Sequence, residues 1–556
     1  MDKRTKQLSQ ALDLHKQGQV REAIRQYEIV RRKTGGGATL HLYLGIAYAQ
    51  SGNLEDAREN FEQCILYDPK NFTAHFNYGK LLEDNNLLEE ARTQYEKSLQ
   101  INPKHLPAYL NLSGTRRKLG DIAGAIQALD DAISVNPKFA DAHTNRGILL
   151  GELNKGPESL ESLDQAIHLN PTSATALNNR GTRLRELNRL SEALEDLNRA
   201  LELQPAYAEA HNNRGNILRD LNKHEEALLC FDKALSLQPN YASAHWNKSI
   251  TLLALGKFQS GWSEYEWRLK LKPENTRTYS AENWIGSSSL EGKKLFVYSE
   301  QGYGDIVQFC RYLPELASLK CEIIFELPQN LLSLISSLSC KFTALAKGAS
   351  LPKFDAYCAL MSLPHALGTD LNSIPGKIPY LSVDPDKKSE WEKFLGPREK
   401  TRIGLAWSGR KTHQNDHNRS IPLELLHPIL QLPHEFHSLQ TEYRSDDLKT
   451  LNRITALSRH DDVIEDFADT AALVECLDLV ITVDTSIAHV AGALGKPVWV
   501  LLPYSPDFRW MLKRIDSPWY PTAKLFRQKN RNDWSSVIEN LVNHLRESSF
   551  NNSITH

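Results

Sequence analysis

The sequence lacks most of the features that would identify a protein class at once. Its seven cysteines are an odd number and none forms a Cys-x-x-Cys pair, so we expect reduced thiols and no zinc site. No stretch approaches the ~18 consecutive apolar residues that a membrane-spanning helix needs. The 66 basic and 68 acidic residues leave a formal charge of −2 without a single-sign tail, which argues against a nucleic-acid partner. These absences predict a soluble cytoplasmic protein that selects its partners by local surface.

The first half of the chain has a 34-residue period. Prolines mark it at Pro69, Pro103, Pro137, Pro171, Pro205, Pro239 and Pro273. Glycines keep the same register at Gly45, Gly79, Gly147, Gly181 and Gly215, as do alanines at Ala23, Ala57, Ala91, Ala125, Ala193 and Ala227. Two helices per period, close together where a glycine meets an alanine and ended by the proline step, are typical of the tetratricopeptide repeat (TPR).

The repeats are expected to stack, because one helical hairpin cannot bury its apolar face alone. Stacking would give an all-α superhelix whose concave face is lined by the first helix of each pair. Residues 6–33 keep Ala23 but are followed by three glycines, and we interpret them as an N-terminal repeat. In the last repeat Gly261, Trp262 and Trp267 replace the expected alanines, which predicts that this repeat packs against a larger body.

The second half of the chain follows a different pattern. A chain of 556 residues is too long for one core, so at least one further domain is expected. Short apolar runs alternate with helical segments, a pattern typical of parallel sheets buried on both faces. The runs lie at 295–298, 323–327, 403–407, 436–439, 479–483 and 498–502. A charged, proline-bearing connector at 385–401 would divide this half into two Rossmann-like lobes, with an amphipathic helix near the C-terminus.

The first chemically distinctive segment, residues 300–305, directly follows the first predicted strand. Ligands of parallel sheets bind at the carboxyl ends of the strands, so Gln301, Gly302 and Gly304 are predicted to line a cleft. Asp305 would stand at the start of the next helix. A tight turn with Asp305 as a helix cap explains the same residues.

The second segment follows the strand at 403–407 and contains Ser408, Gly409, Arg410 and Lys411. A glycine beside two cations suits a diphosphate, because the backbone can approach closely and the charge is neutralised. A solvated basic loop is the alternative.

The third segment, residues 483–489, combines the end of a strand, a turn and the start of a helix. Thr485 or Ser486 can cap a helix whose free N–H groups and positive dipole end receive phosphate. His489 lies one turn into that helix, above Thr485, and follows the strand-end Asp484. A histidine in this place is otherwise a structural residue.

Together with residues 466–472, 491–497 and 517–521, these segments resemble the bacterial TPR-linked glycosyltransferases. The second half is similar to the ADP-heptose lipopolysaccharide heptosyltransferases, and the order of domains resembles protein O-GlcNAc transferase. The most specific part is Asp-Thr-x-x-x-His at 484–489, followed by Ala-Leu-Gly-x-Pro. The resemblance implies an all-α TPR superhelix over 1–275 and an α/β body of the GT-B type. Its acceptor-side lobe would cover 276–390 and its nucleotide-sugar lobe 391–556.

The resemblance also implies an activity: transfer of a sugar from a nucleotide-diphosphate donor to a hydroxyl, with inversion at the anomeric carbon. Asp305 matches the catalytic base of the heptosyltransferases, where a Gly-Asp pair stands at Gly304 and Asp305. The residues implied to hold the donor diphosphate are Asp484, Thr485, Ser486 and His489, with Ser408, Gly409 and Lys411 nearby. Heptosyltransferases usually have glycine where this chain has Ser486.

No metal and no cofactor besides the nucleotide-sugar co-substrate is implied, because a helix dipole and basic side chains would stabilise the leaving phosphate. The cleft segments contain no Asp-x-Asp sequence. Asp384-Pro385-Asp386 lies in the connector and is expected to end a strand.

The acceptor is suggested by a column of asparagines in the repeats, at Asn77, Asn111, Asn145, Asn179, Asn213 and Asn247. A side-chain amide both donates and accepts, so such a ladder can pair with the backbone of an extended peptide. It resembles the asparagine ladder of O-GlcNAc transferase, although asparagines that merely bridge adjacent helices would give the same pattern. The neighbouring cations, which would favour acidic segments or simply be solvated, are Arg146, Arg180, Arg214 and Lys248.

Three functions remain open on the sequence. The preferred one is a glycosyltransferase whose acceptor is a protein or peptide bound in the TPR groove. In the second, the acceptor is a glycan or a lipid-linked sugar and the repeats serve assembly. In the third, the cleft is degenerate and the chain is a non-catalytic TPR scaffold.

Overall fold

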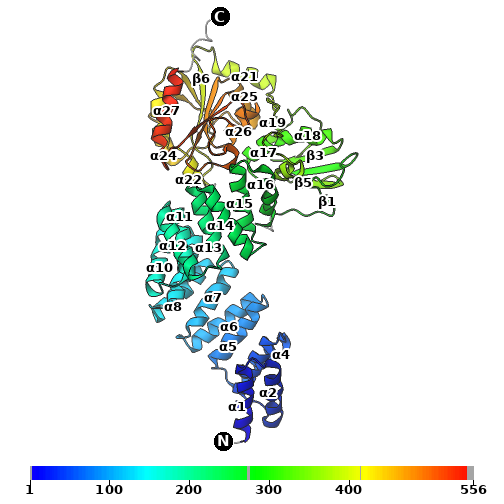
Figure 1. Ribbon diagram of the computed structural model, residues 1–556, viewed down its shortest axis with the longest axis vertical. Coiled ribbons are helices and arrows are strands. Elements are labelled where there is room, and N and C mark those ends of the chain that lie inside the picture. Colours follow the sequence, from blue (N-terminus) through cyan, green and yellow to red (C-terminus); the bar gives the residue numbers. More distant parts are fainter. Residues whose placement is uncertain (1–2, 272–275, 413–414, 548–556) are drawn as a thin grey trace. The chain divides into compact units, whose positions relative to one another are not determined.

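A computed structural model describes residues 3–271, 276–412 and 415–547, and these divide into two compact units, Met1–Asn213 and Arg214–His556. Antiparallel helix pairs occupy the region of the repeats, as the 34-residue period predicts (Figure 1). The helices are α1 (Lys3–Lys16), α2 (Val20–Thr34), α3 (Ala38–Gln50), α4 (Leu54–Tyr67), α5 (Phe72–Asp84), α6 (Leu88–Ile101), α7 (Leu106–Lys118), α8 (Ile122–Val135), α9 (Ala140–Glu152), α10 (Gly156–Leu169), α11 (Ala174–Glu186), α12 (Leu190–Leu203), α13 (Ala208–Asp220), α14 (His224–Leu237), α15 (Ala242–Ala254) and α16 (Phe258–Tyr265).

The periodic residues have clear roles in these helix pairs. The second helix of a pair ends just before its proline, as α4 does at Tyr67 before Pro69. Pro273 lies outside the described residues. At Gly45, Gly79 and Gly215 the periodic glycine makes room for an aromatic side chain of the second helix, whereas Gly181 lies against the main-chain oxygen of Ala193 and against Leu197. A Cβ added to Gly45 would lie 2.7 Å from the ring of Phe61, and the same relation holds between Gly79 and Tyr95.

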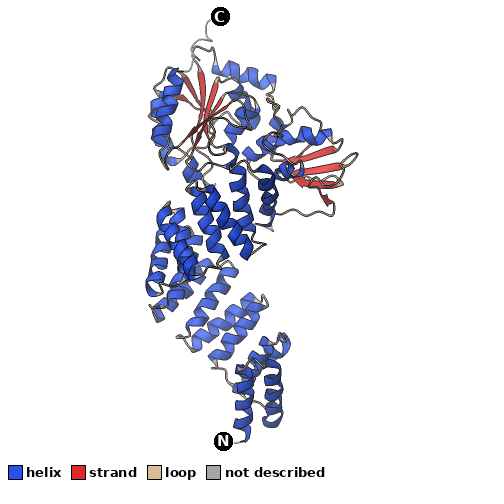
Figure 2. Ribbon diagram, in the orientation of Figure 1, coloured by secondary structure: helices blue, strands red, loops and turns tan. Residues whose placement is uncertain are grey.

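The first sheet of the body has five parallel strands in the order β1-β5-β2-β3-β4 (Figure 2). They are β1 (Glu282–Asn283), β2 (Lys294–Tyr298), β3 (Glu322–Leu327), β4 (Thr343–Ala346) and β5 (Ala356–Ala359).

The second sheet has six parallel strands in the order β11-β10-β9-β6-β7-β8. They are β6 (Arg402–Ala406), β7 (Glu435–Ser438), β8 (Leu457–Ser458), β9 (Leu479–Val483), β10 (Val498–Leu502) and β11 (Ala523–Arg527). The six apolar runs identified in the sequence coincide with β2, β3, β6, β7, β9 and β10, which confirms the parallel α/β prediction.

The strand order determines where a ligand can bind. Counted from β6, the six strands follow the doubly wound order 3-2-1-4-5-6, and the direction of winding reverses between β6 and β9. In the other sheet the corresponding reversal lies between β2 and β5. Ligands of such sheets bind beyond the carboxyl ends of the strands at the reversal. The segments after β2, β6 and β9 are those that the sequence singles out.

Helices cover both faces of the six-stranded sheet (Figures 1 and 2). On one face α27 (Trp534–Glu547) contributes Val537 and Leu541 to the core that contains Ile403 of β6. On the other face α25 (Phe467–Glu475) and α26 (Ser486–Ala493) join a core that continues into the first lobe. The shorter helices are α17 (Tyr303–Phe309), α18 (Leu313–Ser318), α19 (Leu332–Ile335), α20 (Leu363–Ala366), α22 (Asp416–Arg419), α23 (His427–Leu430), α24 (Ser445–Leu451), η1 (Glu266–Lys270), η4 (Gln329–Leu331) and η7 (Phe508–Trp510).

The connector at 385–401 differs from the prediction, because it contains helix α21 (Pro385–Leu395). The Asp384 carboxylate accepts a hydrogen bond of 2.8 Å from the Asp386 N–H, so Asp384 begins a helix and does not end a strand. Proline suits the first helical turn, where its missing N–H would have no partner. The boundaries at 275 and 390 stay predictions, and residues 272–275 lie outside the described part of the chain.

The last repeat packs against the body, as its tryptophans predict. The buried Trp262 ring meets Phe309 and Phe508 edge to face, with centroid distances of 5.9 and 5.8 Å. The Arg268 guanidinium is buried and its Nη2 donates to Glu300 Oε1 at 2.7 Å. Residues of the last repeat therefore contact the turn that leads to Asp305.

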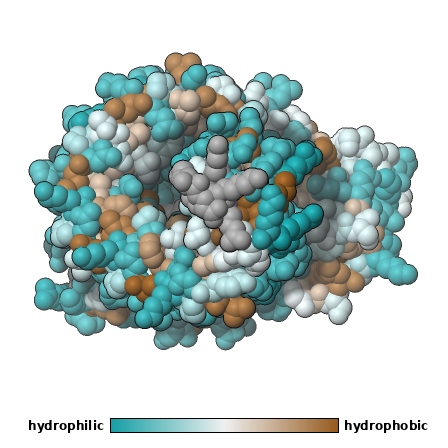
Figure 3. All heavy atoms as spheres, turned by 90° about the horizontal axis from the view of Figure 1, so that it is seen from below, coloured by the Kyte–Doolittle hydropathy of each residue, from teal (hydrophilic) through white to brown (hydrophobic). Residues whose placement is uncertain are grey.

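The face of the molecule seen in Figure 3 is mainly hydrophilic, with apolar residues scattered over it. None of the helices in the described ranges is both long enough and apolar enough to cross a bilayer.

Candidate active site

A cavity of about 800 Å³ lies between the two lobes of the body, and all three predicted segments line it. Asp305 comes from the first lobe and His489 from the second. The volume lies in the range of small-molecule and cofactor sites. Lining residues from the sequence prediction are Gly302, Gly304, Asp305, Ser408, Gly409, Asp484, Thr485, Ser486 and His489.

Two predicted residues do not line the cavity. Gln301 turns toward the last repeat, where its amide donates to the Tyr265 hydroxyl at 3.3 Å. Lys411 is exposed, and the arginines that line the cavity within the described residues are Arg410, Arg419 and Arg509. The backbone of Gly409 lies directly against Arg419: a Cβ at Gly409 would be 2.4 Å from Arg419 Nη2. A side chain at 409 would therefore displace this guanidinium, and the assignment of Lys411 to the donor diphosphate stays a prediction.

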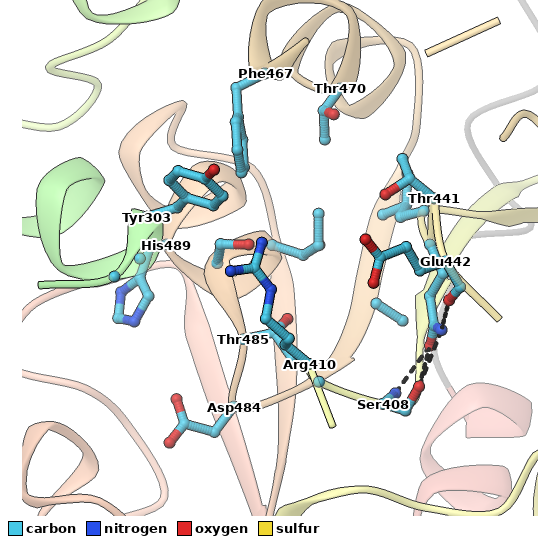
Figure 4. Close-up of a pocket in the computed structure, with 18 of the residues that line it drawn as sticks. Tyr303, Ser408, Arg410, Thr441, Glu442, Phe467, Thr470, Asp484, Thr485 and His489 are labelled. Atoms are coloured by element: carbon cyan, nitrogen blue, oxygen red, sulfur yellow. Dashed lines mark hydrogen bonds between the residues drawn. The ribbon is translucent and has the colours of Figure 1, made fainter. Parts of the chain in front are cut away.

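Arg419 ties the loop after β6 to the end of β9. Its Nη1 donates to the main-chain oxygen of Asp484 at 2.8 Å. The loop itself is fixed by Gln440, whose Oε1 accepts from the N–H groups of Trp407 and Ser408, each at 2.8 Å (Figure 4). The Arg419 guanidinium is thus held at the reversal between β6 and β9, beside a loop whose own N–H groups are bonded to Gln440, and a guanidinium in this place suits an anion.

The N-terminus of α26 opens into the same place. Thr485 is its N-cap residue and Ser486, Ile487 and Thr485 line the cavity. The Thr485 hydroxyl lies 3.1 Å from the Thr482 hydroxyl and does not cap the helix. The first N–H groups of α26 therefore lack a side-chain cap, and with the helix dipole they favour a negative charge at this end.

Asp484 is half-buried beside this site. Burial raises the pKa of its carboxyl, and the neighbouring Asp507 raises it further, against the opposing effects of Trp510, Arg419 and Arg509. In Figure 4 its carboxyl group points away from Arg410. Its contact with the site is made by its main-chain oxygen, through Arg419.

Asp305 has two partners, one in each lobe. Its Oδ2 accepts from the Gly302 N–H at 2.8 Å, so it caps α17, and its Oδ1 forms an ion pair with Arg509. Arg509 is buried and also donates to Asp507 Oδ1 and Gln308 Oε1, each at 2.8 Å. Burial disfavours the Arg509 cation, but the two carboxylates outweigh this and raise its pKa. Sequence reasoning missed Arg509, whose only signal is its place after β10.

His489 is buried against the first lobe. A Cβ on Gly304 would lie 2.8 Å from its Cδ2, so this glycine lets α17 approach α26. Burial, with Arg509, Arg311 and Arg419 nearby, lowers the pKa of His489 well below its usual value. Its Nδ1 lies 3.0 Å from the Tyr520 hydroxyl. Sequence reasoning included Tyr520 only as part of a family resemblance.

The other end of the cavity is formed by residues that the sequence analysis did not identify. Leu439, Thr441 and Glu442 follow β7, and the Glu442 carboxylate points toward the interior in Figure 4. Tyr303 and Phe467 meet edge to face at 5.2 Å, one from each lobe. The signal available was the position of 439–442 beyond the carboxyl end of a predicted strand.

The asparagine column is half-buried throughout. Asn77 and Asn179 donate to carbonyls of their own helices, Thr73 O and Thr175 O, at 2.8 Å. Asn213 Nδ2 donates to Asn178 Oδ1 of the preceding first helix at 2.9 Å. Asn213 therefore bridges two neighbouring helices, which is the alternative role considered for these asparagines. The role of the column as a ladder for a peptide stays a prediction.

Three of the four cations beside the column, Arg146, Arg180 and Lys248, form ion pairs within the protein. Arg146 pairs with Asp130 at 2.6 Å, and Lys248 pairs with Asp232 at 2.8 Å. Arg180 pairs with Asp164 and Asp196, each at 2.7 Å. These carboxylates lie on second helices, so the three cations stabilise the repeats and do not form a free basic stripe.

The chain thus consists of helical repeats followed by an α/β body. The body has two Rossmann-like lobes, and both lobes line one cavity. Residues 447–543 match the family model of glycosyltransferase family 9 (heptosyltransferase). Tetratricopeptide repeat models match residues 8–63, 47–105, 115–174 and 208–241, and a TPR repeat model matches 181–218. The chain therefore combines TPR repeats, which are protein-interaction modules, with a glycosyltransferase family 9 domain.

Among curated proteins, protein FlbA of Caulobacter vibrioides is 25% identical over 314 residues, which are 51% of this chain and 52% of FlbA. The chain thus spans about half the length of this relative. Among solved structures, YrrB, described as a TPR protein with an unusual peptide-binding site, is 26% identical and covers 34% of this chain and 97% of its own, with a TM-score of 0.29. A tetratricopeptide repeat protein from Parabacteroides merdae is 21% identical and covers 45% and 98%, with a TM-score of 0.38.

Proposed function

We propose that this chain is a metal-independent, inverting glycosyltransferase that moves a sugar from a nucleotide-diphosphate donor to a hydroxyl of a polypeptide. One observation carries the proposal: a single cavity holds Asp305 from one lobe and, from the other, the N-terminus of α26 with Arg410 and Arg419. A base and a receptor for a leaving diphosphate are the two groups that such a transfer requires.

The donor diphosphate is proposed to lie at the N-terminus of α26. There the backbone N–H groups of Ser486 and Ile487 and the dipole of the helix would receive it, with Arg419 neutralising its charge. Ser408 and Gly409 would line this subsite from the loop after β6, with their own N–H groups bonded to Gln440 Oε1 and Ser420 Oγ. The nucleoside would extend toward 439–442, where the Glu442 carboxylate can accept hydrogen bonds from ribose hydroxyls.

In the proposed reaction Asp305 removes a proton from the acceptor hydroxyl as its oxygen attacks the anomeric carbon. The new carbon–oxygen bond forms on the face opposite the diphosphate, and the bond to the phosphate oxygen breaks with its electron pair. Attack from the opposite face inverts the configuration. Arg509 and the Gly302 N–H hold the Asp305 carboxylate in place before the acceptor arrives.

The polypeptide is proposed to lie along the asparagine column. Asn77 and Asn179 use their amide N–H groups within their own helices, which leaves the carbonyl oxygens of their side chains as acceptors for a peptide N–H. Pairing with the backbone would not depend on the acceptor's sequence.

A panel of UDP-, GDP- and ADP-sugars assayed for slow hydrolysis tests the donor without knowledge of the acceptor. We expect turnover of at least one donor in a buffer containing a chelator, and loss of that turnover in Asp305→Ala. If no sugar nucleotide is bound or hydrolysed, the chain is not a glycosyltransferase of this kind.

Mass spectrometry of proteins co-expressed with the chain tests the acceptor. We expect added sugar on serine or threonine hydroxyls, and less of it when Asn77 and Asn179 are both changed to alanine. Donor hydrolysis in the same variant should be unchanged, because the asparagines lie outside the cavity. Sugar found only on glycans would contradict the polypeptide acceptor and leave the donor assignment intact.

A further inference from the structure

We propose that Tyr520 is a positioning residue that acts through His489. Its hydroxyl donates to His489 Nδ1 and so fixes the single proton of the neutral imidazole on Nε2, where it can donate to the leaving diphosphate. Only the identity of the ligand, a leaving diphosphate, rests on the proposed function. The assignment of the proton itself rests on contacts within the protein.

The imidazole is buried and uncharged. The His489 side chain is 4% exposed, and this burial lowers the pKa of its imidazole. The guanidinium groups of Arg509, Arg311 and Arg419 lower it further, so the pKa lies well below its usual value. A neutral imidazole carries one proton, so one ring nitrogen donates and the other accepts. Which nitrogen holds the proton is decided by the hydrogen bond made at the other.

The neighbours of Tyr520 decide the direction of the hydrogen bond to Nδ1. The Tyr380 hydroxyl donates to Val307 O at 2.9 Å and accepts from Arg311 Nη2 at 3.2 Å. With its one proton already used, the Tyr380 oxygen can only accept. Tyr520 therefore chooses between two acceptors, Nδ1 of His489 at 3.0 Å and the Tyr380 oxygen at 3.5 Å. The shorter contact is a normal hydrogen bond and the longer is at the limit of one, so the proton points to Nδ1.

The other ring nitrogen is left for a ligand. Within the described residues no hydrogen bond is made to His489 Nε2, and His489 lines the cavity beside Thr485 and Ser486. A Cβ on Gly304 would lie 3.5 Å from this nitrogen. An N–H in this position stabilises an anion at the N-terminus of α26, whereas a lone pair would repel it.

The packing holds both rings in place. Trp510 stacks on the imidazole with centroids 5.7 Å apart. Gly492 lies under the Tyr520 ring, since a Cβ there would be 2.4 Å from Tyr520 Cδ1. Two glycines, Gly304 and Gly492, thus make room for the two hydrogen-bonded rings.

A double-mutant cycle separates this role from a structural one. Tyr520→Phe keeps the ring and its packing but removes the donor, and His489→Leu removes the imidazole. Isothermal titration with the nucleoside diphosphate of the accepted donor should show a loss of affinity of about 5- to 10-fold for Y520F, the size expected for one hydrogen bond. Y520F should cause no further loss in the H489L background. An equal loss in both backgrounds would overturn the proposal.

A spectroscopic measurement tests the proton directly and needs no ligand. The full chain is labelled with nitrogen-15 in histidine, and the signals lost in H489L identify His489. We expect an unprotonated Nδ1 and a protonated Nε2 in the wild-type chain, and a mixture of the two forms in Y520F. A proton on Nδ1 in the wild type would refute the inference. If instead the proton is on Nε2 but no nucleotide binds, the proposed function fails and the tautomer assignment stands.

Discussion

Asp305 at the start of α17 and Arg509 in η7 form an ion pair across the cavity, although 204 positions separate them in the sequence. Arg509 at the same time holds Asp507 of its own lobe and Gln308 of the other. The only described carboxylate that the first lobe contributes to the cavity is therefore oriented by a residue of the second lobe. Any movement between the lobes changes the position of the proposed base.

Replacement of Asp305 tests its chemical role. Asp305→Asn keeps an oxygen for the Gly302 N–H but cannot remove a proton, so turnover of the donor should fall by about 10²- to 10⁴-fold, the usual contribution of a general base. Binding of the nucleoside diphosphate, measured by calorimetry, should change little. Turnover at the wild-type rate in both Asp305→Asn and Asp305→Ala would show that Asp305 is only the cap of α17.

The glycine under Arg419 allows a matched test of the diphosphate site. Gly409→Ala places a methyl group within 2.4 Å of the Arg419 guanidinium and must displace it. We expect nucleoside diphosphate to bind about tenfold more weakly, equivalent to roughly 1.4 kcal/mol. Lys411→Ala is the control from the same loop. Because Lys411 is exposed and lies outside the cavity, this variant should bind nucleoside diphosphate as tightly as the wild type does. The opposite ranking would favour Lys411 as the diphosphate ligand.

Much of the fold could be predicted because it is encoded in local patterns. The 34-residue period gave the helix pairs, and β2, β6 and β9 are continuous apolar runs. Five strands were missed. β1 and β8 have two residues each, and β4 has no buried residue. The buried β5 has only four residues, and β11 carries two charged side chains among its five. The sequence of 385–401 looked like a linker because its helix begins with proline.

The candidate site was predictable only as far as strand ends could locate it. The segments after β2, β6 and β9 converge because the carboxyl ends of parallel strands lie at one edge. Choosing Arg419 rather than Lys411 as the cation beside the proposed diphosphate requires the path of the loop after β6, and no local sequence pattern gives that path. Arg509 and Tyr520 act on residues 204 and 31 positions away, through contacts that exist only after folding.

The raised pKa of the half-buried Asp484 gives a prediction for stability against pH. Because its pKa in the folded protein is raised above the unfolded value, the ionised carboxyl destabilises the fold at neutral and higher pH. Asp484→Asn removes this charge and should stabilise the body by about 1 to 3 kcal/mol at pH 8. The gain should disappear toward pH 4, where the wild-type carboxyl is protonated. Thermal unfolding of both forms across this range measures it, and a gain that is equal at all pH values would exclude ionisation as the cause.

The buried pair of Arg268 and Glu300 connects the last repeat to the turn that carries Asp305. Arg268→Met would leave both Glu300 and Glu266, the second partner of Arg268, without their cation, and burial already raises the pKa of Glu300. We expect a loss of about 3 to 5 kcal/mol, the range for breaking a buried ion pair. The loss should grow as pH rises, because the unpaired Glu300 is then forced to ionise.

The double variant Arg268→Met with Glu300→Gln separates the cost of the unpaired charge from the loss of packing. It should recover most of the stability measured by thermal unfolding, since a neutral amide can remain buried at less cost than a carboxylate. Lys257→Ala is the surface control: its ion pair with Glu225 is exposed and worth about 0 to 1 kcal/mol. If Arg268→Met reduces donor hydrolysis while Lys257→Ala does not, the last repeat holds the turn of Asp305 in its active position. Unchanged hydrolysis in a destabilised Arg268→Met would mean that the pair stabilises the fold without positioning the base.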